Sequence, residues 1–88
     1  MGLFKVEVNT LSPLQNINIY SFNKNIYINI PNYQNTQITV YDITGNIIYT
    51  KSPEGTSEII NMENFAAGIY VVSVKQGGNF VTKKVNVE

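Results

Sequence analysis

The chain has 88 residues, with six lysines balanced by six acidic residues and with neither cysteine nor histidine. This length fits one domain, and the absence of cysteine excludes disulfides and thiolate chemistry. A formal net charge of zero without any arginine argues against nucleic-acid binding, and no run of 18 apolar residues is present to span a membrane.

Residues 1–15 differ from the rest of the chain, and we expect a linker or the end of a preceding region there. Leu3–Val8 alternates like a short strand or an extended linker, and Asn9–Gln15 carries the Thr, Ser and Pro residues of a linker. The start lacks both the basic opening and the apolar run of a signal peptide. We expect Met1 and Gly2 to be foreign residues on a domain cut from a longer protein.

Residues 16–88 are expected to form one domain built from one strand after another. Alternating apolar and polar residues are typical of half-buried strands, and no segment shows the helical period. The expected strands are Asn16–Phe22, Ile26–Ile30, Gln37–Tyr41, Ile47–Lys51, Thr56–Met62 and the two halves of a hairpin around Gly77–Gly78. Six to eight short strands predict an all-β fold, a small antiparallel immunoglobulin-like β-sandwich of about seven strands.

Two connections carry specific expectations. In the turn Asp42–Asn46, the Asp42 side chain is expected to bond its own backbone two residues on, and Gly45 to supply a positive φ. In the connection between Glu63 and Gly68, Phe65 is expected to plug the end of the core.

The C-terminal hairpin is the stretch around which we expect the domain to be organised. In the first half, Tyr70, Val72 and Val74 fall on one apolar face. In the second half, Val81, Val85 and Val87 do the same, and Lys83 interrupts them. A terminal strand frays unless it is held by pairing, so these two halves are predicted to pair.

Groups for catalysis are scarce. The usual general base, thiol nucleophile and most transition-metal ligands are missing. Glu58 and Glu63 are the nearest carboxylates outside turns, and we expect solvated surface groups there rather than a glycosidase pair. No further carboxylates follow Asp42, so a calcium loop is not expected. We therefore expect no enzyme, no cofactor and no metal site.

Tyrosines and lysines leave two binding readings open. Five of the six tyrosines fall in expected strands, where sheet packing explains them, and Tyr33 in a loop is the one ring left for a carbohydrate or protein contact. The Lys83–Lys84 pair is typical of a solvated sheet edge that discourages pairing. An uncovered edge would instead favour an edge-strand dimer of the isolated domain.

Segments spread over the chain resemble one family. They are Val-Tyr-Asp-Ile-Thr-Gly at 40–45, Phe-Ala-Ala-Gly-Ile-Tyr-Val-Val-Ser-Val-Lys at 65–75, and Lys-Lys-Val-Asn-Val-Glu at 83–88. Their order and spacing resemble the C-terminal sorting domain of cargo proteins of the type IX (Por) secretion system, over about residues 16–88. Tyr20–Asn23 followed by Ile26–Ile28 resembles the opening strands of one variant, without the common Tyr-Pro-Asn-Pro opening. Asn46 stands where the family often has Arg or Lys.

The resemblance implies secretion and sorting without catalysis. It implies a cargo domain upstream in the same precursor, transit through the periplasm, and recognition of the folded domain by an outer-membrane translocon. A surface sortase would then cut within or before Val8–Gln15, which leaves the cargo at the cell surface or outside the cell. By match to the family, the sorting signal would be carried by Gly68, Tyr70, Lys83, Lys84, Val85 and Val87. The alternatives are a surface adhesion or carbohydrate-binding or protein-binding module, and an immunoglobulin-like spacer.

Overall fold

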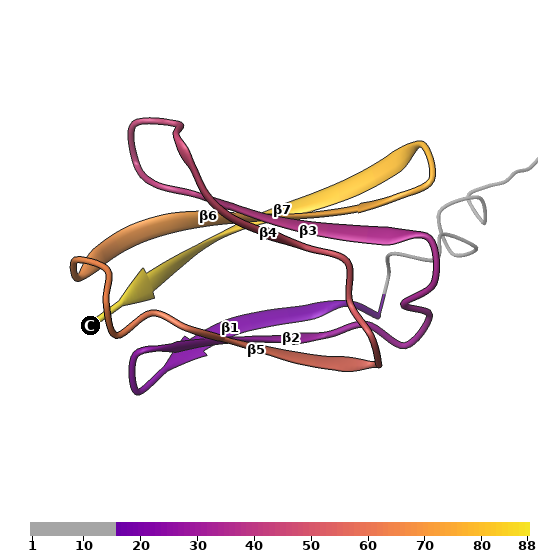
Figure 1. Ribbon diagram of the computed structural model, residues 1–88, viewed down its shortest axis with the longest axis horizontal. Coiled ribbons are helices and arrows are strands. Elements are labelled where there is room, and N and C mark those ends of the chain that lie inside the picture. Colours follow the sequence, from indigo (N-terminus) through magenta and orange to yellow (C-terminus); the bar gives the residue numbers. More distant parts are fainter. Residues whose placement is uncertain (1–15) are drawn as a thin grey trace, which may run out of the picture.

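The computed structural model describes residues 16–88, which form two antiparallel sheets stacked face to face (Figure 1). One sheet has the strand order β1-β2-β5 and the other β4-β3-β6-β7. The strands are β1 (Asn18–Phe22), β2 (Asn25–Asn29), β3 (Thr36–Tyr41), β4 (Ile47–Lys51), β5 (Ser57–Asn61), β6 (Gly68–Gln76) and β7 (Asn79–Val87). The expected all-β sandwich of about seven strands is confirmed, while the expectations for Leu3–Val8 and for the linker lie outside the described residues.

Three hairpins and three crossings between the sheets build this sandwich. The hairpins are β1–β2, β3–β4 and β6–β7, and the chain changes sheet after β2, β4 and β5. Asn23 and Lys24 form the first hairpin turn with φ of 55° and 66°, as a tight turn that follows the strand twist requires. Within the described part of the chain, no helix is long and apolar enough to cross a membrane.

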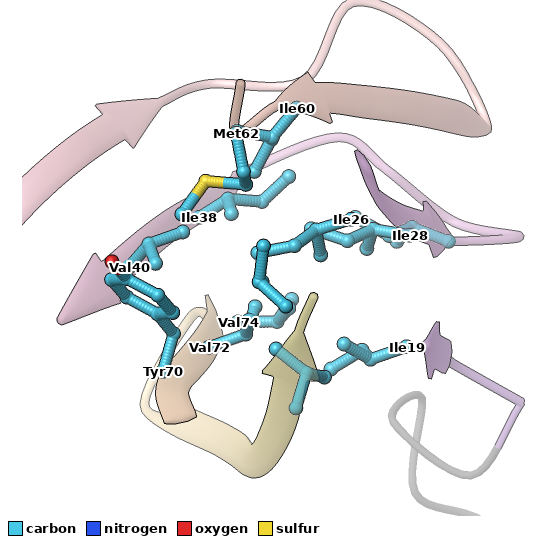
Figure 2. Packing of buried hydrophobic residues seen from close by; sticks show 13 residues of the cluster. Ile19, Ile26, Ile28, Ile38, Val40, Ile60, Met62, Tyr70, Val72 and Val74 are labelled. Atoms are coloured by element: carbon cyan, nitrogen blue, oxygen red, sulfur yellow. The ribbon is translucent and has the colours of Figure 1, made fainter. Parts of the chain in front are cut away.

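The core lies between the two sheets and is made by alternate residues of both inner faces (Figure 2). Because side chains of a strand alternate between its faces, the period-2 runs of the sequence place one residue in two in this layer. The fully enclosed members are aliphatic residues and one methionine, namely Ile26, Ile28, Ile30, Ile38, Met62, Val40, Val72 and Val74. Figure 2 shows the isoleucines of β2 pointing toward the valines of β6.

One expectation about the core was wrong. Phe65 does not plug its end, because 38% of the residue is exposed, whereas Met62 is 1% exposed and fills that position. The Phe65 N–H donates to the Met62 carbonyl at 3.0 Å, so the chain turns tightly there and carries the ring outward. Tyr33 lies in the loop between β2 and β3 as expected, where it is half-buried, packs against the core and lines a hollow; its contact with a carbohydrate or protein stays a prediction.

Glu58 was also expected to be a solvated surface group, and this was wrong. It lies on the inner face of β5 beside Ile60 and is 9% exposed. An ionised carboxylate is buried at this depth only when it has partners, which are described below.

Candidate functional site

The hairpin of β6 and β7 is the longest paired element of the domain. Its register runs without interruption from the Gln76–Asn79 pair at the turn to the Gly68–Val87 pair at the other end. The two-residue turn Gly77–Gly78 has φ of 60° at Gly77, so the expected hairpin and its turn are confirmed. The last strand is thereby held by nine pairs to its neighbour.

Gly68 and Tyr70 serve the start of this hairpin. Gly68 has φ of 150°, a conformation that residues with a Cβ rarely adopt, and its own Cβ position is otherwise unobstructed. The Tyr70 ring is buried, and its hydroxyl donates to the Ala66 carbonyl at 2.5 Å. Both residues therefore fix how the chain enters β6 and offer little surface to a partner.

Val85 and Val87 belong to the core. Val85 lies opposite Tyr70 and Val87 opposite Gly68, and both side chains are buried. The resemblance places them in the sorting signal, and the structure places them where they hold β7 in the sheet. A partner would read them only through the strand that they position.

Lys83 and Lys84 lie on opposite faces of β7. Lys83 pairs with Val72 and faces the inner side of the sheet, whereas Lys84 pairs with Val71 and faces outward. The alternation of strand side chains separates them, so the two ammonium groups do not form one basic patch. Both residues are exposed because β7 is the last strand of its sheet.

The outer edge of β7 carries backbone groups that no described strand pairs with. A two-residue turn makes Gln76–Asn79 a hydrogen-bonded pair, and hydrogen-bonded and non-hydrogen-bonded pairs then alternate along the hairpin. The N–H and C=O groups of Phe80, Thr82, Lys84 and Asn86 consequently point away from β6. Ser21 confirms this direction, since its hydroxyl donates to the Asn86 carbonyl at 2.6 Å.

A groove of about 460 Å³ runs between β1 and the same stretch of β7. Its lining combines apolar side chains from both strands with one charged group, and comprises Ile17, Asn18, Ile19, Tyr20, Asn29, Val81, Thr82 and Lys83. On β7 the groove is lined only by residues 81–83, and the Ser21–Asn86 contact lies outside it. Sequence reasoning missed this groove, although the period-2 pattern already put Lys83 on the valine face.

The opposite side of the sandwich, between β4 and β5, is closed by an ion pair. Lys51 Nζ lies 3.0 Å from Glu58 Oε1, and the Glu54 N–H donates to Glu58 Oε2 at 2.9 Å. Burial opposes ionisation of Glu58, but the Glu54 N–H and the Lys51 ammonium together outweigh it and lower the pKa of the carboxyl. The hydrogen bond to Glu58 likewise raises the pKa of Lys51.

The turn after β3 is built as expected around Asp42. Its Oδ1 accepts hydrogen bonds from the Thr44 N–H at 3.0 Å, the Thr44 hydroxyl at 2.7 Å and the Asn46 N–H at 2.9 Å. The Thr44 hydroxyl and the Asn46 N–H lower the pKa of this carboxyl. Gly45 has φ of 96°, which confirms its predicted role. All of Asp42's described partners lie within its own turn, so the motif is structural.

The described residues contain no group of three acidic side chains placed to hold a metal ion. A hollow of about 560 Å³ lies at the end of the sandwich near the Gly77 turn and has Lys75 as its single charged lining residue.

A family described as the secretion system C-terminal sorting domain matches residues 22–88. That range contains six of the seven strands entire and the last residue of β1. No curated protein matches the chain.

Proposed function

Because the chain belongs to the family of type IX secretion system C-terminal sorting domains, we propose that the outer-membrane translocon reads it through the free edge of β7. The family makes the chain the sorting part of a larger cargo precursor, whose destination is the cell surface or the exterior of the cell. Sorting domains of this family are non-catalytic in general, and we propose the same for this chain.

The observation that carries this proposal is the open backbone edge of β7. Nine pairs to β6 and two core valines hold the strand rigidly, and the groups on its other side face outward. A preformed edge of this kind lets a partner add a strand with backbone hydrogen bonds, while pockets and charges beside it supply specificity. Lys83 and Lys84 then contribute from the two faces of the strand, by electrostatic complementarity to acidic groups.

The remaining steps follow from the family resemblance. We propose that the precursor passes through the periplasm, and that a surface sortase cuts within or before residues 8–15, upstream of the sandwich. The folded domain would be released or processed after delivering its cargo, and no chemistry would be required of its own side chains.

A reporter protein carrying residues 16–88 behind a signal peptide tests the proposal in a cell that has the type IX machinery. The reporter should reach the medium or the surface, and its Lys83→Gln, Lys84→Gln double variant should accumulate in the periplasm. The control places the same change of net charge at the far edges, as Thr50→Glu with Ser57→Glu, and should be exported normally. Equal export of all three proteins would refute reading through β7.

A second candidate function, binding of neutral glycans, is favoured by the outer face of the smaller sheet. The Tyr20 and Tyr27 rings stack there with centroids 5.1 Å apart and planes 12° apart, and Tyr20 is 47% exposed. Aromatic and aliphatic side chains alternate with amides and one hydroxyl over this face, and none is charged, the residues being Asn18, Tyr20, Phe22, Asn25, Tyr27, Asn29, Ser57, Ile59 and Asn61. Retention on a glycan array that disappears with Tyr20→Ala and persists with Tyr33→Ala would support it.

A further inference from the structure

The two edge strands of the larger sheet each carry one lysine on the inner face. Lys51 on β4 pairs with the buried Ile38, and Lys83 on β7 pairs with the buried Val72. A charged side chain that points inward from an edge strand discourages a further strand from pairing there, because the new strand would take the charge out of water. Both edges of this sheet therefore carry an inward-pointing lysine that opposes the pairing of a further strand.

The two lysines differ in what faces them. Lys51 meets Glu58 of the other sheet at 3.0 Å, so its charge is compensated within the domain. Among residues 16–88 no carboxylate lies within ion-pair distance of Lys83, and the groove beside it is lined by aliphatic, amide, hydroxyl and tyrosine side chains. The β7 edge thus presents a cation beside a groove of mixed polar and apolar lining, and no compensating acid is found in the described part of the domain.

We propose that β7 accepts an extended strand of the translocation machinery that carries an aspartate or glutamate facing Lys83. This inference rests on the function proposed above and names the chemistry of the partner. A strand added to β7 places one of its side chains on the inner face opposite Lys83, with Cβ atoms about 5 Å apart. An apolar residue there would desolvate the ammonium, and a cationic residue would repel it, so both are rejected. A carboxylate reproduces the pair that Lys51 makes with Glu58.

The same lysine keeps the domain from pairing with itself. When two β7 edges pair in antiparallel fashion around residue 82 or 83, Lys83 lies opposite or diagonal to Lys83 of the copy. Like charges at these positions oppose the dimer, although the backbone edges are complementary. The β7 edge therefore selects for an acidic partner strand and disfavours pairing with the β7 edge of a second copy.

Mixing the domain with its own Lys83→Glu variant tests this selectivity without the secretion machinery. Wild type alone and the variant alone should each remain monomeric in size-exclusion chromatography with light scattering. The equimolar mixture should form a heterodimer of twice the monomer mass, because a lysine of one copy then faces a glutamate of the other. The heterodimer should dissociate in 1 M salt, where the screening length falls to about 3 Å.

The matched control is Lys84→Glu, which makes the same charge change on the outer face of the same strand. Its mixture with wild type should stay monomeric, since the two Lys83 side chains still repel. A Lys83→Glu mixture without heterodimer, or an equal heterodimer with Lys84→Glu, would overturn the inference.

Export of the reporter provides the second arm. Lys83→Glu should lower the export rate at least tenfold, whereas Lys83→Arg keeps the charge and should stay within twofold of wild type. Full export of Lys83→Glu would overturn the partner that we infer. Failure of the wild-type reporter to be exported would instead count against the proposed function, and the mixing experiment would still decide whether the edge selects for acids.

Discussion

The Val85→Ala variant tests whether Val85 only holds β7 in the sheet or is itself contacted by the translocon. Val85 is 5% exposed and packs opposite Tyr70. The substitution removes two carbons from a closed core, at about 0.8 kcal/mol each, and leaves a small cavity, so we expect a loss of about 2 kcal/mol. A domain of this size has a free energy of unfolding on the order of 5 kcal/mol, so the variant remains more than about 99% folded at 25 °C.

Urea unfolding followed by tyrosine fluorescence measures this loss. With a slope of about 1 kcal/mol per M, the midpoint should fall by roughly 2 M. Asn86→Ala is the matched control, because the neighbouring side chain is exposed on the other face, and its midpoint should move by less than about 0.5 M.

Reporter export then distinguishes the two roles. Because Val85→Ala stays folded, we expect its export rate to match wild type, in contrast to the loss expected for Lys83→Glu. A folded Val85→Ala domain that is no longer exported would refute our reasoning, since it would mean that the translocon contacts the valine itself. An unchanged unfolding midpoint would equally contradict its place in the core.

Further predictions concern the ion pair, the start of β6 and the turn at Asp42. Folded Glu58 has a pKa below its usual 4.5, so its stabilisation is present at higher pH and is lost as the pH falls through the folded pKa. Glu58→Gln should therefore lower stability at pH 7 and reduce the loss of stability between about pH 5 and pH 3, as measured by urea midpoints across that range. Gly68→Ala should cost about 1–3 kcal/mol through backbone strain, whereas Gly55→Ala, at an open position without a positive φ, should be neutral in thermal melts. Asp42→Ala should lower the melting temperature at pH 7, and the difference from wild type should shrink as the pH falls, because the lowered pKa makes its stabilisation a property of the ionised carboxylate.

The strands were predictable because their information is local. The run Ile26–Ile30 alternates so clearly that only its bounds shifted by one residue, to Asn25–Asn29. The turn at Asp42 was predictable for the same reason, since one side chain accepts from two residues of its own turn. Fold class followed from repeating such units along 73 residues.

Partnerships across the sandwich were not predictable from local pattern. Glu58 looks like a surface residue beside Ile59, and only the stacking of β5 against β4 brings it to Lys51. Phe65 has the larger apolar side chain, yet Met62 takes the core position because the turn places the Met62 side chain inward. The first outcome depends on how the two sheets are set against each other, and the second on the conformation of the turn that follows β5.

The lysine pair is an intermediate case. The alternation of side chains along a strand predicts that Lys83 and Lys84 lie on opposite faces, so this part of the site could have been predicted from the sequence. What the sequence lacked was the strand order, which makes β7 an edge and leaves the groove beside β1 open.

Amide hydrogen exchange along β7 tests most directly whether one side of this strand is held and the other open. The amides of Val81, Lys83 and Val85 point toward β6 and should exchange slowly. Those of Thr82 and Lys84 point outward and should exchange at least a hundredfold faster in the isolated domain. Uniform slow exchange over all five amides would show that the edge is already covered and would contradict recognition by strand addition.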